Sequence, residues 1–529
     1  MYPLTPKNPF DQNSSHDVRH PKVASFRIIL NTGILYVKMI ITIFVSLYSV
    51  RLILNALGAS DFGIYNVVGG IISALAFLQS SMTVSTQRFL SYHQGAHNQS
   101  KLNQIFGSSM ALHIVLGFVV LLILYIVQPL LFHDFLNIPE ERIFVAKNIY
   151  SFMSFSIFCT ILSVPFLASL NAHENMLTTS VIGIIQVSLN LLLALSLSFS
   201  KYDRLILYGV GILIINAIIL IFYYIYCQKK YPECSFSTIR LSNIFTIKEM
   251  ISFTGWNTFG ALSGVSKNHG LSIVFNLFYG TIINAAWGIA NQIASQLNAF
   301  SSNLLKAMNP QIMKSEGAND RERMMRLSMI ASKYGFYLGA LFCIPFVFEM
   351  HSILAQWLTN VPENTAMFCQ TILISLLISQ TTVGIQSAIQ ATGNIKLYMI
   401  LVGATKLALV PLSYLFLQFG LSLFTVMVAF ISLEMMAGFF RLICLRKSCN
   451  ISIMKYFRVV YKKIIPPLGI IVFTGCFLCR LCSFRYRFLL TIPVMMLSLV
   501  LSIYFFEMTK HEKRLIHFFI KTVKQKIFL

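Results

Sequence analysis

Apolar segments about twenty residues long recur along this chain, and no other feature limits its possible folds as strongly. The first runs from Ile28 to Val50, and similar runs follow between short polar loops. A helix needs about 20 apolar residues to cross a hydrocarbon core about 30 Å thick. Open β-sheet cannot span lipid because its edge groups stay unpaired. The sequence therefore predicts an all-α polytopic membrane protein.

The distribution of charge agrees with this class. Charged residues make up 11% of the 529 residues, against roughly a quarter in an ordinary soluble chain. The net charge is +23, and about thirty of the 41 Lys and Arg lie in the tails and even-numbered loops, with about seven in the odd-numbered loops. This positive-inside asymmetry predicts that both termini are cytoplasmic, and it explains the basic residues without a nucleic-acid partner.

About fourteen membrane helices are expected from these segments. Those of the first half cover residues 28–50, 63–80, 106–132, 146–170, 177–199 and 205–227, those of the second half cover 250–275, 281–305, 331–357, 366–391, 395–418 and 421–444, and the last two cover 464–482 and 486–507. The expected division is a disordered tail (1–27), a six-helix bundle (28–227), a cytoplasmic linker (228–249), a second six-helix bundle (250–446), two additional helices (464–507) and a basic tail (508–529).

The two halves resemble each other in sequence. A shift of 222 positions along the chain carries Gly58 onto Gly280 and Gly95 onto Gly317 without a gap. Further along the shift changes by a few residues, so that the segment 168–175 corresponds to 387–394. Because six helices are an even number, both halves insert the same way round. We therefore expect a parallel repeat, related by an axis along the membrane normal.

Ten cysteines lie almost entirely within the apolar segments. Cys476, Cys479 and Cys482 form a C-x-x-C-x-x-C run near a helix end, but no histidine or acidic residue stands beside them. They are interpreted as small apolar residues of a helix, with a metal or redox site as the alternative. The chain also lacks a nucleotide-binding loop and any catalytic spacing of Cys and His, so no metal, cofactor or catalytic residue is expected.

Basic residues at membrane depth are the candidate substrate-binding residues. Lys38 and Lys267 lie in the middle of corresponding helices, and Lys406 lies in the segment 395–418. Such groups cost about 2.5–3.5 kcal/mol at a helix centre, and they usually face a water-filled cavity or a partner. The alternatives are snorkelling to the membrane surface or pairing with Glu434, the one clearly deep acid, which is also the candidate for ion coupling.

Arg51 and Arg88 flank helix ends and are two further candidates for substrate binding. For both, the alternative is that they anchor the topology. A cavity lined by these cations and nearly free of acids suits an anionic substrate, above all a phosphate or pyrophosphate.

Four stretches of the chain resemble a known family. RLILNALGASDFGIYNVVGGI (51–71), TQRFLSYHQG (86–95), NLFYGTIINAAWGIANQI (276–293) and NPQIMKSEG (309–317) are similar to the bacterial polysaccharide-repeat flippases. These belong to the multidrug/oligosaccharidyl-lipid/polysaccharide (MOP) exporter superfamily, and the resemblance covers nearly the whole chain. One departure is Trp287, which stands where the family leads us to expect an arginine.

This resemblance implies two six-helix bundles that face each other as a V, with two helices added outside. It also implies a flippase in the bacterial inner membrane, which moves an undecaprenyl-pyrophosphate-linked oligosaccharide of O-antigen, capsule or another surface polysaccharide to the periplasmic leaflet. Alternating access is the implied mechanism. The implied partners are this lipid-linked glycan, membrane lipids and a polysaccharide polymerase.

Three other interpretations stay open. A multidrug exporter of the same superfamily would have twelve helices and an acidic cavity. An O-antigen polymerase or ligase would carry a large periplasmic loop with functional arginines, and an enzyme has no reason for a parallel repeat. A scaffold of a glycan-assembly complex would need no transport at all. The sequence favours a transporter over an enzyme.

Overall fold

The computed structural model describes residues 21–73, 75–132, 138–235, 238, 243–358, 360–449, 452–481, 484, 486–508 and 513. Within them every element is helical: α1 (Pro21–Ser73), α2 (Ala76–Gly95), α3 (Gln99–Leu130), α4 (Glu140–Ala172), α5 (Met176–Leu197), α6 (Arg204–Lys230), η3 (Pro232–Cys234), α7 (Ile244–Gly317), α8 (Arg321–Trp357), α9 (Thr365–Gln380), α10 (Val383–Thr392), α11 (Lys396–Gln418), α12 (Leu423–Cys449), α13 (Ile453–Tyr456), η5 (Phe457–Tyr461), α14 (Lys462–Leu481), α15 (Phe488–Ser502) and η6 (Ile503–Glu507). Most of the expected tail 1–27, nearly all of the basic tail 508–529 and Cys482 lie outside the described residues.

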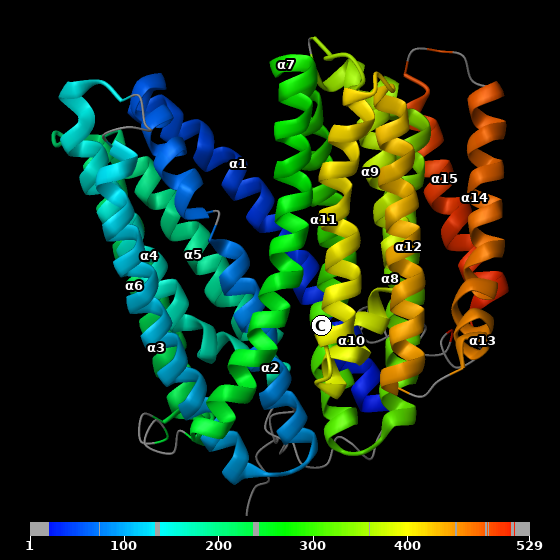
Figure 1. Cartoon of the computed structure of the whole chain (residues 1–529), viewed down its shortest axis with the longest axis horizontal. Coiled ribbons are helices and arrows are strands. Elements are labelled where there is room, and N and C mark those ends of the chain that lie inside the picture. Colours follow the sequence, from blue (N-terminus) through cyan, green and yellow to red (C-terminus); the bar gives the residue numbers. More distant parts are fainter. Residues whose placement is uncertain are drawn as a thin grey trace, which may run out of the picture.

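Two bundles make up the molecule. In Figure 1, α3 to α6 lie on the left, most of α7 to α12 lies to their right, and α13 to α15 lie at the far right. α1 runs from the lower middle of the view to the upper left, and α2 lies near the bottom. The bundles diverge at the top of the view and meet at the bottom. In the described part of the chain, 11 helices are long and apolar enough to cross a membrane, or up to 12 if a bent pair counts as one span. The prediction of an all-α polytopic membrane protein is confirmed.

The count of 11 to 12 spans is below the expected fourteen, and α1 and α7 explain much of the difference. Each is a single long helix by hydrogen bonding, with 53 and 74 residues. A straight helix of 74 residues would be about 110 Å long, but Ser272 Oγ donates to Asn284 Oδ1 across 12 residues of α7, at 2.5 Å. Trp287 Nε1 likewise donates to the Asn268 carbonyl at 3.2 Å. The α7 chain therefore folds back on itself, and its arms 244–279 and 281–317 lie side by side next to the break.

A glycine breaks the helix in both α1 and α7. Gly58 has φ +76° and ψ 171°, and Gly280 has φ +75° and ψ −164°. This region of backbone space is essentially restricted to glycine. A Cβ added to either residue would meet no atom within 4 Å, so the requirement is conformational and not one of space. The two glycines are the pair that the shift of 222 positions aligns.

Replacing Gly280 by alanine is expected to destabilise the protein by about 1–3 kcal/mol, because alanine is strained in this conformation. Thermal unfolding in detergent measures the loss. Gly288→Ala is the matched control, since Gly288 lies on the same helix with open space around it and no positive φ. Equal unfolding temperatures for the two variants would contradict the assigned turn.

The expected helix 366–391 is bent. It consists of α9 and α10, which meet at an angle of 46° after Gln380. Side chains of neighbouring helices supply the hydrogen bonds at the break: Ser332 Oγ accepts from the Gly384 amide at 2.9 Å, and Thr382 Oγ1 accepts from Arg441 at 3.0 Å. Because these partners come from α8 and α12, the bend could not be predicted from the local sequence.

The C-terminal pair α14 and α15 packs on the outside of the second bundle, against α8. The carboxylate of Glu349 on α8 is fully buried there. It accepts hydrogen bonds from Arg487 at 3.1 Å and from Thr491 at 3.0 Å. A buried carboxylate is tolerated when it is paired in this way, so Glu349 ties the added helices to the second bundle.

Candidate functional site

Four charged residues gather inside the second bundle. Glu434 and Arg441 lie on one face of α12, and Arg441 donates to Glu434 at 3.1 Å with both side chains buried. Lys267 on α7 and Lys406 on α11 interact electrostatically with Glu434 and with each other. Three cations thus surround one carboxylate, which already has an arginine partner. Sequence reasoning identified Lys267, Lys406 and Glu434 but did not include Arg441.

An aromatic group supports Lys267. Its ammonium lies 4.0 Å from the centre of the Phe430 ring, a cation–π contact. Trp287 packs edge-on against Phe430 and is 1% exposed. Where the family resemblance leads us to expect an arginine, this chain therefore has a core residue that supports the neighbours of Lys267.

A second lysine pair lies where the first bundle faces α7. The Lys38 ammonium lies against Gly183 of α5, within 2.6 Å of the position that a Cβ would take. Its charged neighbour is Lys306, on the second arm of α7, and the two ammonium groups repel each other. Lys306 was not among the residues predicted from the sequence, because the helix expected there ended at residue 305. Two like charges that repel each other favour an anion between them.

The two arginine candidates lie apart from these lysines. Arg51 is exposed on α1. Arg88 is 6% exposed and lies over the rings of Phe89 and Phe253, at 4.7 and 5.4 Å. Its guanidinium donates to the carbonyl of Ala391, in the other bundle, at 3.2 Å. Arg88 thus connects the two bundles near the end where they meet.

The bundles cross closely at that end. A Cβ on Gly95 would lie 2.0 Å from the carbonyl oxygen of Lys314, and one on Gly317 would lie 1.8 Å from that of Tyr92. Both glycines and both carbonyl residues are pairs at the same shift of 222 positions. The contact is therefore pseudo-symmetric, and no larger residue fits on either side.

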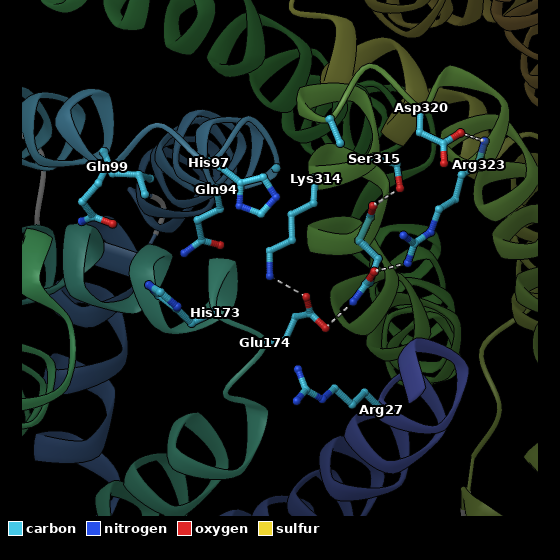
Figure 2. A pocket seen from close by; sticks show the side chains of 14 residues that line it. Arg27, Gln94, His97, Gln99, His173, Glu174, Lys314, Ser315, Asp320 and Arg323 are labelled. Atoms are coloured by element: carbon cyan, nitrogen blue, oxygen red, sulfur yellow. Dashed lines mark hydrogen bonds and ion pairs between the residues drawn. The ribbon is translucent and has the colours of Figure 1, made fainter. Parts of the chain in front are cut away.

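Glu174 makes a further connection between the bundles, shown in Figure 2. It lies in the turn between α4 and α5, with φ +59°, and its side chain is 4% exposed. Its two carboxylate oxygens accept from Lys314 and from Gln311, each at 2.6 Å. Its backbone carbonyl accepts from Asn31 of α1 at 3.1 Å. We call the contact of Glu174 with Lys314 and Gln311 the carboxylate latch.

The carboxylate latch is ionised at neutral pH. Burial acts to raise the pKa of Glu174, but the charge of Lys314, hydrogen bonds from Lys314 and Gln311, and the charge of Arg27 outweigh it and hold the pKa below its usual value. A depressed carboxyl pKa stabilises the folded contact at higher pH. The latch therefore contributes at neutral pH and is lost as the pH falls through the pKa of the folded state.

A pocket of about 260 Å³ lies beside this latch. Figure 2 shows Arg27, Gln94, His173, Lys314 and Arg323 around it. In the described residues no group of three or more His, Cys, Asp or Glu could hold a metal ion. The C-x-x-C-x-x-C run stays an untested motif, because Cys482 lies outside the described residues.

Comparison with known proteins gives one family match, one curated relative and several similar solved structures. Residues 35–195 match the MatE family model. A curated relative, the "Probable multidrug resistance protein YoeA" of Bacillus subtilis (strain 168), is 23% identical over 306 residues, which span 56% of this chain and 65% of that protein. The matched region thus covers slightly less than two thirds of the relative.

Solved structures resemble nearly the whole fold. The outward-facing conformation of a multidrug resistance MATE family transporter of the MOP superfamily superimposes with a TM-score of 0.69 at 15% identity, covering 83% of this chain and 98% of that one. A MOP superfamily transporter from Pyrococcus furiosus, described by a "reverse polarity of binding pocket" that "suggests different function", gives 0.65 at 14% identity, covering 79% and 95%.

These findings support the coarser part of the sequence prediction. The fold is MATE-like, and part of the chain, residues 35–195, matches the MatE model. The polysaccharide branch, which the sequence resemblance implied, has no counterpart in the curated relative, whose name refers to multidrug resistance.

Proposed function

We propose that this MATE-family transporter of the MOP superfamily is a flippase for undecaprenyl-pyrophosphate-linked oligosaccharides, the repeat units of O-antigen, capsule or another surface polysaccharide. It would move them from the cytoplasmic to the periplasmic leaflet of the bacterial inner membrane. The observation that carries the proposal is the set of four lysines on helices that are long and apolar enough to cross a membrane: Lys38, Lys267, Lys306 and Lys406.

The charge balance of these residues favours an anionic substrate. Lys38 and Lys306 repel each other, and an anion placed between them would relieve that repulsion. In the second bundle, Arg441 already neutralises Glu434, so Lys267 and Lys406 are left in excess. A pyrophosphate offers several anionic oxygens to lysines, which bind phosphate as point charges. A cationic drug would meet repulsion at both places.

The arrangement of the bundles supports alternating access. They meet at the end that carries the carboxylate latch and diverge at the other end. The positive-inside asymmetry of the loops would place the closed end and both termini in the cytoplasm. The sugar head group would then cross between the bundles while the lipid tail stays in the bilayer. Glu434 is the candidate residue for coupling transport to an ion. A polysaccharide polymerase is the proposed protein partner.

A second candidate function is the export of drugs. The name of the relative from Bacillus subtilis favours it, as do the MATE structures that share the fold. Export of a cationic compound would need a free carboxylate on its path, and the deep carboxylate Glu434 is held by Arg441. An anionic drug would fit the same lysines as a pyrophosphate. The fold therefore does not distinguish the two functions, and an experiment is needed.

Sidedness of the lipid-linked glycan tests the flippase proposal. A glycosidase confined to the periplasm is applied to cells with and without this gene. Glycan that accumulates protected in the deletion strain, and becomes cleavable on complementation, is the expected result. Unchanged accessibility together with increased drug sensitivity of the deletion strain would refute the flippase function and favour drug export.

A further inference from the structure

The pocket beside the carboxylate latch has the chemistry of an anion site. It is lined from both bundles: Arg27, Gln94 and Glu174 come from the first, and Lys314 and Arg323 from the second. Its volume of about 260 Å³ is well above the roughly 10–15 Å³ that a cavity needs to hold one water. It lies at the closed end of the molecule, beside the crossing of Gly95 and Gly317.

The pocket already binds one anionic group, the carboxylate of Glu174. Lys314 and Gln311 donate to it, and the charge of Arg27 acts on it as well. Arg323 extends the network, because it donates to Gln311 Oε1 at 3.2 Å. Ammonium, guanidinium and amide donors converging on an oxyanion are the groups that also bind phosphate. The side chain of Glu174 thus occupies a place that a phosphate can compete for.

Gln94 supplies a separate observation. Neither its amide nitrogen nor its amide oxygen has a hydrogen-bond partner, although both atoms are buried, and the residue lines the pocket. A buried polar atom without a partner costs about 1–3 kcal/mol. A ligand with acceptor oxygens would take the hydrogen bond of the Gln94 amide. This argument does not depend on the charges of the neighbouring residues.

We propose that this pocket binds a phosphate or pyrophosphate group, which displaces Glu174 from Lys314 and Gln311 and thereby releases the carboxylate latch. Glu174 belongs to the first bundle and its two partners to the second. Binding of the anion and separation of the bundles are then linked, so that each favours the other. That the phosphate group belongs to a lipid rests on the proposed function. That the pocket binds a phosphate does not.

The corresponding turn of the second half lacks the acidic residue. In the segments that correspond between the halves, Glu174 is matched by Gly393, which also has a positive φ, of +85°. Arg88 packs on Gly393, and its hydrogen bond goes to a backbone carbonyl, at Ala391. That contact contains no carboxylate to be displaced. The anion would therefore act on the contact of Glu174 and leave that of Arg88 in place.

Binding of inorganic pyrophosphate to the purified full chain in nanodiscs, followed by calorimetry, is the first test. Glu174→Gln is expected to raise the affinity at least tenfold because the competing carboxylate is removed, and Lys314→Gln to lower it at least tenfold. Glu322→Gln and Lys229→Gln are matched controls that change exposed charges outside the pocket, and both are expected to change the affinity less than twofold. Effects of Glu174→Gln and Lys314→Gln no larger than those of the controls would overturn the site.

A second measurement reports on the latch. Spin labels at Ser100→Cys and Glu322→Cys, one in each bundle, give the distance across the closed end in a cysteine-free background. Pyrophosphate is expected to lengthen this distance in the wild-type chain and not in Lys314→Gln. Should Glu174→Gln fail to fold, Glu174→Asp replaces it, since the shorter carboxylate competes less well. Binding without any change in distance would overturn the proposed release.

The affinity for a prenyl pyrophosphate of short chain length shows whether the bound group is a free phosphate or a lipid head group. Equal affinity with inorganic pyrophosphate would assign the pocket to the phosphate alone, and tighter binding would assign it to a lipid head group. Either result supports the anion site. The two proposals can fail separately. If the protein binds pyrophosphate but its deletion leaves the sidedness of the glycan unchanged, the flippase function is refuted and the anion site stands.

Discussion

Exchange of Lys38 and Lys267 together for alanine is expected to lower glycan export at least 100-fold while the protein still inserts. A hydrogen bond to a charged group contributes about 1.5–3 kcal/mol, and two such losses correspond to a factor of 100 or more. Lys38 lies beside Gly183 on the first bundle, and Lys267 lies over Phe430 in the second. The double variant therefore removes one cation from each side of the proposed substrate path.

Glycosidase release in the periplasm, normalised to the amount of membrane protein, measures this loss. Lys229 and Lys230 replaced by alanine are the matched control, because both are exposed at the end of α6. They keep the change in net charge while leaving the candidate site intact. Wild-type export by the Lys38/Lys267 variant at equal expression would refute the assigned site and would favour a scaffold function.

Replacing Gly95 or Gly317 by leucine is expected to lower transport at least 100-fold, as the exchange of the two lysines does. The crossing leaves 2.0 Å between a Cβ of Gly95 and the Lys314 carbonyl, and 1.8 Å between a Cβ of Gly317 and the Tyr92 carbonyl. Backbone atoms cannot move aside as a flexible side chain can, so the bundles cannot meet. The variants would stay in the conformation in which this end is open.

The same pair of spin labels, at Ser100→Cys and Glu322→Cys, checks this prediction. The distance across the closed end is expected to be long in both leucine variants, even without ligand. Gly438→Leu provides the control, because no atom lies within 4 Å of the position of a Cβ there. A short distance together with normal export in Gly95→Leu would show that the observed crossing is dispensable.

Much of this architecture can be predicted from the sequence, because apolar length and helical periodicity are local properties. Gly58 and Gly280 stood out as matching positions, and the structure gives them the same rare backbone conformation. Lys267, Lys406 and Glu434 could be chosen because charge at membrane depth is costly wherever it occurs. Features of this kind can be recognised from the residues of a single helix.

Other features depend on partners distant in the sequence. Glu174 is an ordinary polar residue of a turn until Lys314, 140 positions away, donates to it. Arg88 looked like a residue at a helix end, and its contact with Ala391 spans 303 positions. The bend after Gln380 depends on Ser332 and Arg441 in the same way. Local patterns cannot identify such contacts, because either residue alone is compatible with many surroundings.

The attachment of the C-terminal helices through Glu349 makes the two bundles unequal partners in any rocking motion. α14 and α15 pack against α8, so they must travel with the second bundle as one wider body. The first bundle has no such companion among the described helices, and it displaces less lipid when it moves. The viscous drag of the bilayer rises with the size of the moving body, so we expect the first bundle to move further than the second.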